Sequence, residues 1–326
     1  MARTHASSVS FPSTGLVKVA SCILLLFFTV SATLFTEASK RPDGTYPYNT
    51  FVVPCAVEAL KCATSSIMFI YQRKSQIPLG FTLRSFVAYA FPALCYFVSN
   101  NCMFYVIQYL GATTFQIMNN LKILTTAVFM YVFLGRKLSW VQWKALVMLV
   151  VGCMVTQLST NSNEGDRMDT RSALLGYVLV FLSAIASGAG GVFSEKLLKG
   201  KVTERNEVTS QEDSIHWKNL QLYIFGLFFG LMSLQMNAHG VSALNRDVFN
   251  GFNVFAYATV ATLAVCGLLV SFILKYLDNV AKCFCSALSM LCVALLDSAM
   301  KRETIPLRIT LAIILTGLSL EQYHLS

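Results

Sequence analysis

The sequence is poor in charged residues. Only 13% of its 326 residues are Asp, Glu, Lys or Arg, and 55% are hydrophobic, whereas soluble globular chains have about 25% charged residues. The mean hydropathy is +0.59. This composition excludes an ordinary soluble domain. It predicts an all-α integral membrane protein, because a helix satisfies its own backbone hydrogen bonds inside a bilayer.

Catalytic and metal-binding patterns are also missing from the sequence. The four histidines are in predicted tails or loops, and the ten cysteines are in or beside apolar segments without any Cys-x-x-Cys pair. No P-loop, GxGxxG motif or intramembrane hydrolase pair is found. We therefore predict no enzyme, no metal site, no cofactor and no disulfide framework.

Ten stretches are long enough to cross a bilayer, which takes about 20 apolar residues. The predicted spans are 17–36, 51–72, 86–107, 111–134, 139–159, 172–194, 218–238, 252–274, 279–299 and 304–323. The links between them are short. Residues 1–326 are therefore expected to form one polytopic domain, with 1–16 as a cytosolic tail.

The net charge of +9 does not indicate nucleic-acid binding, because the positive charges are divided unevenly between two sides. With a cytosolic N-terminus, the tail and the links on that side carry fifteen Lys and Arg, and the opposite side carries eight. Loops rich in Lys and Arg remain in the cytosol. Both termini are therefore predicted to be cytosolic.

The polar segment 159–171 divides five predicted spans (17–158) from five more (172–323). The tripeptide Gln108-Tyr109-Leu110 also resembles Lys275-Tyr276-Leu277, 167 residues later. Because five is odd, a repeated five-span unit must be inverted in the membrane. Two inverted repeats with a site between them are typical of transporters.

Lys122 is the most informative residue, because it is a cation within the apolar run 111–134. A charge inside a bilayer costs about 3 kcal/mol or more, and such residues usually mark a substrate path. At about 100° per residue, Gln116 and Asn119 lie on the face beside Lys122. Glu58 and Lys61 are spaced to form a structural ion pair, which leaves Lys122 for an anionic ligand.

Further polar residues allow two interpretations each. Lys282 either extends to the interface, with Asp278 as a candidate partner, or supplies a second cation for a phosphate group. Asn100 and Asn101 either join helices or line a cavity, where amides can pair with a nucleobase.

The seventh predicted span opens with three alternating polar residues, Asn219, Gln221 and Tyr223. A helix spreads them over nearly half of its circumference, and an unwound helix start is the alternative. Tyr223 is either an interfacial anchor or a ligand contact.

Several motifs together resemble the nucleotide-sugar transporter family, in the branch similar to CMP-sialic acid and UDP-galactose transporters, and most of all its plant and protist members. They are Glu58-x-x-Lys61, Tyr96 with Asn100-Asn101, QIMNNLKILTTAVF, RKLSWVQWKAL, GVFSEKLLK, NLQLY and GLLVSFILKYLDNVAK, spread over about 50–300. The resemblance implies ten helices in two inverted repeats and a Golgi antiporter. It would import a nucleotide-sugar and export the nucleoside monophosphate.

The resemblance also implies roles for single residues. Lys122 and Lys282 would meet the phosphates, and five others would line the nucleoside side: Tyr96, Asn100, Asn101, Asn219 and Tyr223. Phe115 and Phe193 depart from the family, which commonly has Tyr at both positions. The GALNK pattern of GDP-sugar transporters is absent, which favours a pyrimidine nucleotide.

Two other functions remain open from the sequence. The chain could be a carrier of another small metabolite with a similar fold, although buried lysines disfavour cationic cargo. It could instead be a scaffold for a glycosyltransferase, which would not need buried polar residues in both halves. Membrane lipid is an expected partner. The sequence leaves open a homodimer, the choice between CMP and UDP, and the choice between Golgi and endoplasmic reticulum.

Overall fold

The computed structural model describes residues 14–43, 45–73, 83–157, 170–200, 214–236, 248–300 and 305–325. Within these ranges the chain is helical and contains no strand. The helices are α1 (Thr14–Ala38), α2 (Val52–Arg73), α3 (Leu83–Ala88), α4 (Ala90–Asn119), α5 (Lys122–Leu134), α6 (Trp140–Gln157), α7 (Thr170–Lys199), α8 (Ile215–Met236), α10 (Val254–Tyr276), α11 (Asn279–Met300) and α12 (Leu307–Leu325).

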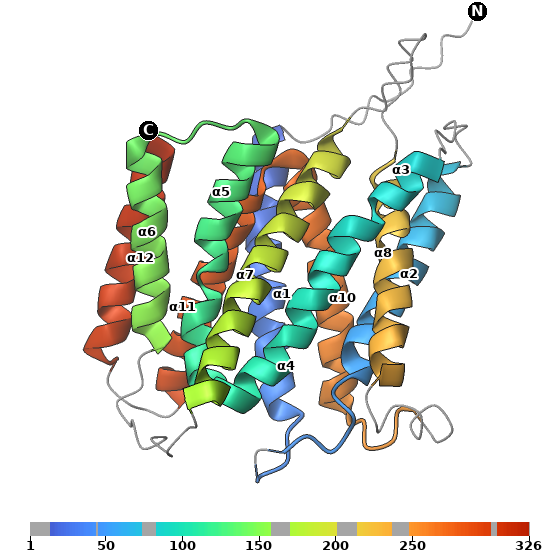
Figure 1. The fold of residues 1–326 in the computed structure, drawn as a ribbon, viewed down its shortest axis with the longest axis horizontal. Coiled ribbons are helices and arrows are strands. Elements are labelled where there is room, and N and C mark those ends of the chain that lie inside the picture. Colours follow the sequence, from blue (N-terminus) through green and yellow to red (C-terminus); the bar gives the residue numbers. More distant parts are fainter. Residues whose placement is uncertain are drawn as a thin grey trace, which may run out of the picture.

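The long helices stand side by side in one bundle (Figure 1). The start of α1 and the end of α12 lie at the same end, which is uppermost in Figure 1 and is called the upper end here. α7, which opens the second half of the chain, begins at the lower end, so it runs opposite to α1.

The helices of the two halves pack in matching ways. The most extensive contact, α4 with α7, is matched by α1 with α10. Likewise α5 with α7 is matched by α1 with α11, and α4 with α8 by α2 with α10. The other two large contacts, α2 with α8 and α6 with α12, join corresponding positions. The first five long helices thus correspond in order to the last five. Exchanging each helix for its counterpart turns every one of these contacts into another contact of the same set.

Every predicted span overlaps a helix, but the predicted boundary between the third and fourth spans is wrong. The chain stays helical through Gly111 to Asn119 and turns at 120–121, so Lys122 begins α5 instead of lying mid-helix. The turn is tight because Asn120 N–H donates to Ile117 O and Leu121 N–H to Met118 O, three residues back. A glycine weakens a helix by only about 1 kcal/mol, and apolar neighbours on both sides of Gly111 carry the helix through it.

Six helices in the described ranges are long and apolar enough to cross a membrane: Gly15–Ala38, Val52–Gln72, Ile117–Leu134, Ala173–Lys199, Val254–Tyr276 and Asn279–Met300. The third of these combines the end of α4 with α5. Large apolar side chains such as Ile67, Phe181 and Phe228 are exposed. Such a surface is suited to lipid, because soluble proteins rarely expose apolar areas of this extent.

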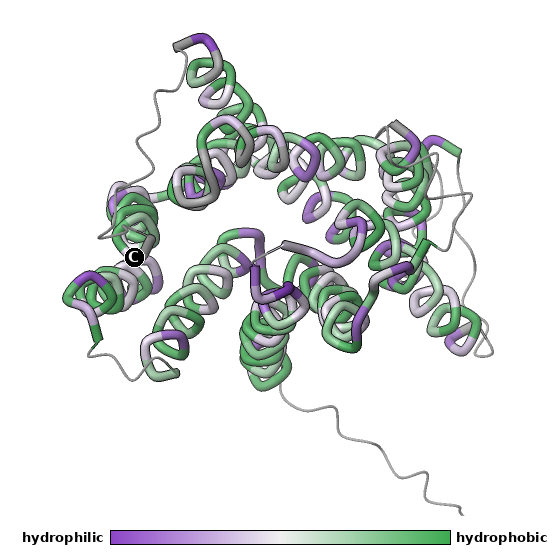
Figure 2. Tube along the Cα trace, turned by 90° about the horizontal axis from the view of Figure 1, so that it is seen from below, coloured by the Kyte–Doolittle hydropathy of each residue, from purple (hydrophilic) through white to green (hydrophobic). Residues whose placement is uncertain are grey.

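Apolar side chains cover much of the outside of the bundle, and polar side chains lie inside it at several positions. In Figure 2, seen from below, most of the tube is green, and purple segments lie at helix ends and within the bundle. A dry core also exists between α5, α6, α7 and α11, where Met130, Leu146, Leu149 and Val192 are fully buried. This core holds α5 and α11 in place, and each of these helices carries one of the two candidate lysines.

Candidate functional site

Two internal cavities meet at Lys122 and Lys282. The first has a volume of about 560 Å³ and is called the aromatic cavity, because Phe51, Tyr96, Phe97 and Tyr223 are in its wall. The second has about 580 Å³ and is called the hydroxyl cavity, because eight Ser and Thr line it: Thr29, Thr33, Thr126, Thr156, Ser187, Ser286, Ser289 and Ser298. Thr29, Lys122, Lys282 and Ser286 belong to both walls.

The two lysines reach this junction from opposite halves of the chain. Lys122 is the first residue of α5 and Lys282 lies in the first turn of α11. Both residues line both cavities. Neither lysine forms an ion pair with any residue in the described ranges. An anion placed between them would therefore be attracted by both.

Asp278 does not pair with Lys282, which corrects one of the sequence interpretations. Its Oδ2 instead accepts from Arg136 Nη1 at 2.7 Å, and its Oδ1 accepts from the backbone N–H of Ala281 at 2.7 Å. The second bond caps the start of α11. Asp278 therefore fixes the helix that carries Lys282 and leaves the lysine side chain to the cavities.

The two asparagines of α4 are used differently. Asn101 Nδ2 donates to Phe97 O at 2.8 Å, and its Oδ1 accepts from Ser233 Oγ of α8 at 2.7 Å. Asn100 is exposed to the aromatic cavity and forms no hydrogen bond with the described residues. The structure thus assigns helix contact to Asn101 and leaves the amide of Asn100 available to a ligand.

Tyr223 is buried in the wall of the aromatic cavity. Its side chain is buried, and its hydroxyl lies 3.0 Å from Ser271 Oγ and 3.3 Å from Gly267 O, both on α10. Lys61 Nζ lies 4.4 Å from the centre of its ring. The ring is therefore held from two sides, as a stacking surface requires.

Glu58 and Lys61 form an ion pair with Nζ 2.5 Å from Oε1. The pair lies against two glycines: a Cβ on Gly226 would be 2.6 Å from Glu58 Oε2, and one on Gly267 would be 2.5 Å from Lys61 Cδ. Both members also line the aromatic cavity. The pair thus joins α2 to α8 and α10 and presents its charged groups to the same space as the candidate ligand contacts.

Of the remaining candidate ligand contacts, one lines a cavity and two are buried between helices. Asn119 lines the hydroxyl cavity. Asn219 and Gln221 are buried in α8 and line neither cavity in the described ranges. Gln221 Nε2 donates to Trp217 O at 3.4 Å, whereas no partner for the Asn219 amide is found among the described residues. The side chain of Gln116 lies outside the described part of the structure.

Phe115 and Phe193 lie away from both cavities. Phe115 packs with Val106, Leu110 and Val180, and the ring of Phe193 lies 4.6 Å from that of Phe91, centre to centre. Neither ring lines either cavity in the described ranges. A hydroxyl at these positions would therefore not be part of the described cavity walls.

Sequence reasoning missed most of the hydroxyl cavity. Its wall includes Thr126 on α5, one turn after Lys122, and Ser286 and Ser289 on α11, four and seven residues after Lys282. Such spacing places them on nearly the same helix faces as the lysines, and this was the available signal. Arg308, near the start of the predicted span 304–323, lies in the first turn of α12 and also lines the cavity.

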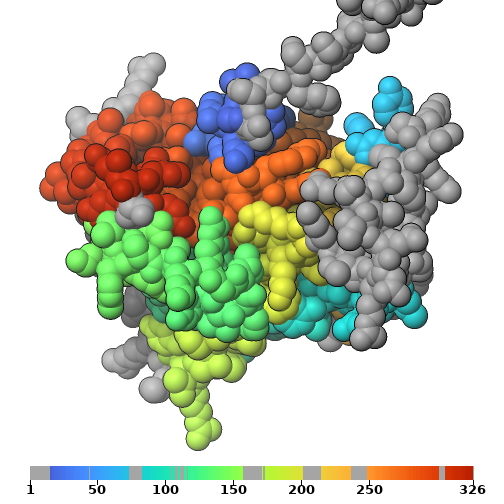
Figure 3. Space-filling model, turned by 90° about the horizontal axis from the view of Figure 1, so that it is seen from above, coloured from blue at the N-terminus to red at the C-terminus, as the bar shows by residue number. Residues whose placement is uncertain are grey.

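An ion pair joins the two halves at the upper end, and polar contacts within the second half lie beside it. The Arg136–Asp278 ion pair connects the α5–α6 link to the α10–α11 link. Glu195, buried at the end of α7, accepts from Lys199 Nζ at 2.7 Å and from Asn279 N–H at 2.8 Å, and Lys199 also donates to Leu277 O. In Figure 3, green, yellow and orange atoms of these segments meet across the middle of this face.

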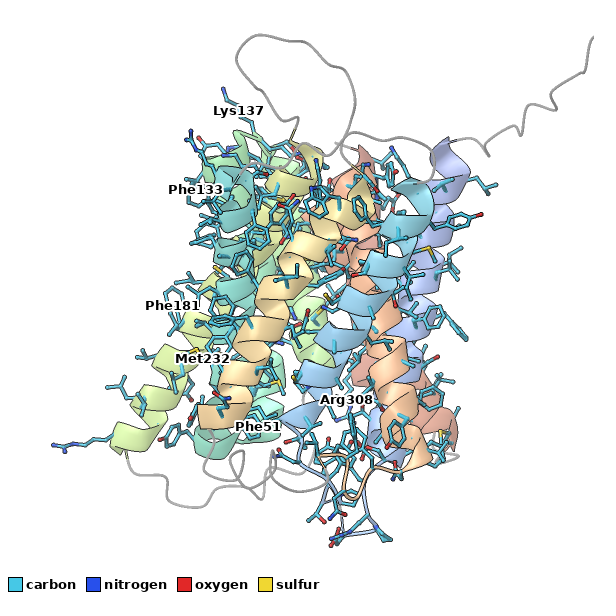
Figure 4. All side chains as sticks on the ribbon, turned by 90° about the vertical axis from the view of Figure 1, so that its right-hand side faces the viewer. Phe51, Phe133, Lys137, Phe181, Met232 and Arg308 are labelled. Atoms are coloured by element: carbon cyan, nitrogen blue, oxygen red, sulfur yellow. The ribbon has the colours of Figure 1, made fainter. Side chains whose placement is uncertain are left out.

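The lower end carries residues from both cavity walls. Phe51, in the aromatic cavity, and Arg308, in the hydroxyl cavity, lie near the lower end of the bundle, opposite Lys137 (Figure 4). Both cavities therefore have wall residues toward that end, and the Arg136–Asp278 ion pair joins the two halves at the upper end.

Chemically, the site can bind an elongated anionic solute, and no group of three or more His, Cys, Asp or Glu in the described ranges could hold a metal. An all-helical bundle with an internal site for a charged solute defines the class of multi-pass membrane carriers. The family model for nucleotide-sugar transporters matches residues 13–318, and the chain belongs to this family.

Known relatives cover most of the chain. It is 31% identical over 309 residues to CMP-sialic acid transporter 1 of Oryza sativa subsp. japonica, covering 93% of this chain and 92% of that protein. It is 30% identical to CMP-sialic acid transporter 1 of Arabidopsis thaliana, covering 92% and 88%. It is 33% identical over 264 residues to the UDP-galactose translocator of Bos taurus, covering 77% and 64%.

A solved crystal structure shares the fold. It aligns with a TM-score of 0.66 at 12% identity, over 97% of this chain and 99% of the other.

Proposed function

We propose that the ten long helices cross the membrane as two inverted five-helix repeats in a single domain, 17–158 and 172–323, joined by a luminal link at 159–171. The matching contacts between the halves support this arrangement, as does the opposite direction of α1 and α7 (Figure 1). The upper end, with both termini, would face the cytosol, in agreement with the distribution of Lys and Arg.

The protein would import a pyrimidine nucleotide-sugar into the Golgi lumen and export the nucleoside monophosphate by alternating access. The names of the relatives support this substrate class. The lower end would then be the luminal side, and the present structure would be the form whose cytosolic end is closed. Exchange follows if the bundle changes conformation readily only with an anion at the lysines.

The observation that carries the proposal is a pair of lysines that lie at the junction of two cavities and form no ion pair within the described part of the chain. Lys122 and Lys282 would bind the phosphate groups. Tyr96, Asn100 and Tyr223 would contact the nucleoside in the aromatic cavity. Asn101, Asn219 and Gln221 would support the wall behind them, Asn119 would contact the ligand in the hydroxyl cavity, and Gln116 stays a proposed substrate contact on its sequence position alone.

Counterflow into proteoliposomes tests the proposal. Vesicles preloaded with CMP, UMP, GMP or AMP are given labelled nucleotide-sugar, and uptake is measured. We expect a pyrimidine monophosphate to give the fastest uptake, and free sugar at equal concentration to compete poorly. Equal uptake with and without preloaded nucleotide, or better competition by the sugar alone, would contradict the proposal.

A further inference from the structure

One face of α7 contacts both of the helices that carry the candidate lysines. Thr125 of α5 donates from Oγ1 to Ala184 O at 2.8 Å, and the backbone N–H of Asn279 in α11 donates to Glu195 Oε2 at 2.8 Å. Each donor lies three residues from the lysine of its helix. Ala184 and Glu195 are eleven residues apart, or about three turns, so they lie on the same face of α7. This face therefore holds the start of α5 and the start of α11.

Two glycines on the same face let these helices approach closely. A Cβ on Gly188 would lie 2.7 Å from Thr125 Oγ1, and one on Gly191 would overlap the side-chain amide of Asn279. The backbone of α7 is thus in direct contact with the first turn of each lysine helix, and it sets how far apart the two helix starts are. Gly191 and Glu195 belong to the motif GVFSEKLLK, to which the proposed function assigns no role.

The carboxylate of Glu195 is fixed by two hydrogen bonds. Its side chain is 1% exposed, and a buried carboxylate is costly unless it is paired and hydrogen-bonded. Its Oε1 accepts from Lys199 Nζ at 2.7 Å, and its Oε2 accepts from the N–H of Asn279 at 2.8 Å. Lys199 in turn donates to Leu277 O, at the end of α10. Movement of this carboxylate would therefore break contacts with both helices of the α10–α11 link.

Glu195 holds α11 in a different way from Asp278. Asp278 caps the helix from the preceding residue, since its Oδ1 accepts from the N–H of Ala281, and it moves with the helix. Glu195 belongs to another helix, so its bond fixes the position of α11 relative to α7. The same first turn carries Lys282, which lines both cavities. A shift of this turn would therefore move the lysine as well.

From these contacts we infer that Glu195 is a positioning residue for Lys282. It holds the first turn of α11 against α7, so that Lys282 meets a phosphate group that Lys122 binds from the other side. The inference rests on the proposed function and goes further, because it gives a task to a buried residue that lines neither described cavity. In this arrangement α7 acts as the spacer between the two lysines.

Binding of CMP and UMP to purified variants tests this assignment, with the tighter of the two as the probe. Affinity is obtained from the rise in unfolding temperature with added ligand, which also reports weak binding. Glu195→Ala should weaken binding about fivefold, since Lys282 loses part of its contact. Glu195→Gln should bind within about twofold of the wild type, because its amide oxygen can still accept from the N–H of Asn279.

A further variant keeps the test decisive if Glu195→Ala does not fold. Glu195→Asp keeps the charge but shortens the side chain, so its carboxylate no longer reaches Asn279. It should weaken binding in the same way as Glu195→Ala.

A double-mutant cycle with Lys282 separates positioning from general damage to the site. If Glu195 acts through Lys282, Glu195→Ala should weaken binding by less than about twofold in the Lys282→Ala background. Ser319→Ala is the matched control, because Ser319 is also buried and donates to another helix, to Ala145 O at 2.5 Å, and lines neither described cavity. It should lower the unfolding temperature without changing affinity.

Unchanged affinity in Glu195→Ala would overturn the assignment, as would an equal loss with and without Lys282. A Glu195→Gln protein that binds as weakly as Glu195→Ala would show that the bond to Asn279 does not position the lysine. The same loss of affinity in Ser319→Ala would mean that any lost helix contact weakens binding. These outcomes leave exchange by the wild-type protein intact, whereas absence of nucleoside monophosphate exchange would contradict the proposed function itself.

Discussion

The aromatic and hydroxyl cavities are nearly equal in volume, yet their walls are built differently. The aromatic cavity contains a fixed ring, an ion pair and amides, and several of its groups are already bonded across helices, as Asn101 is to Ser233 and Tyr223 to Ser271. In the hydroxyl cavity, Thr156 and Ser289 donate to carbonyls of their own helices. Substitution of these two residues would therefore break no described hydrogen bond between helices.

The two walls should therefore respond differently to substitution. In the aromatic cavity, changes at residues bonded across helices, such as Asn101 and Tyr223, should affect folding as well as binding. In the hydroxyl cavity, changes at Thr156 and Ser289 should affect folding less. The following substitutions test that division, and the largest effect is expected at the junction that the two cavities share.

Lys122→Ala should abolish exchange of both nucleoside monophosphate and nucleotide-sugar, because the residue borders both cavities. Loss of one charge-assisted contact corresponds to about 1.5–3 kcal/mol, or about 10- to 150-fold in affinity. Lys122→Arg should retain part of the activity, since the charge remains but its shape changes. Initial rates of counterflow measure both.

Lys144→Ala is the control for this test, because Lys144 is an exposed lysine of α6 that lines neither cavity. Removal of a cation without an acidic partner should not lower thermal stability. A folded Lys122→Ala protein with wild-type exchange would show that the junction does not bind phosphate.

Glu58→Gln should lower stability more than any substitution in the hydroxyl cavity. It leaves Lys61 without its carboxylate in a largely buried place, and breaking such a pair costs about 3–5 kcal/mol. Thermal unfolding in detergent measures the loss. Replacing both residues, Glu58→Gln with Lys61→Met, should recover part of it, and a double variant less stable than Glu58→Gln alone would refute the pairing argument.

Asn100→Ala should mainly weaken ligand binding, whereas Asn101→Ala should mainly lower stability. Asn100 forms no hydrogen bond with described residues and faces the cavity, so its loss should weaken nucleoside monophosphate binding by about fivefold with little change in unfolding temperature. Asn101→Ala removes the bond from Ser233, so its unfolding temperature should fall. The same pattern in both variants would mean that the two amides share one role.

Long apolar runs made the helices of this bundle predictable, because the hydropathy of about 20 residues decides whether a segment enters a bilayer. The turn at 120–121 was not predictable, because it contains neither Gly nor Pro and its dihedrals stay helical. Lys122 was recognised because a cation in an apolar run is exceptional. Thr156 was not recognised, because Ser and Thr are ordinary in membrane helices and only tertiary packing brings α6 to this wall. Ser289 was missed although its spacing from Lys282 was a signal.

Asp278→Asn should have the smallest effect, and it tests the closed upper end instead of the cavities. The substitution weakens the ion pair with Arg136, whose side chain is 46% exposed, and an exposed pair contributes about 1 kcal/mol or less. Because the amide oxygen still accepts from Ala281, the cap of α11 and the position of Lys282 should be kept. Nucleotide affinity should therefore stay the same while the closed upper end becomes less stable. We expect about a twofold to fivefold change in exchange rate at saturating substrate, measured beside Arg136→Gln, which should give the same change. A large loss of affinity in Asp278→Asn would instead show that Asp278 acts on Lys282 and not on the contact between the two halves.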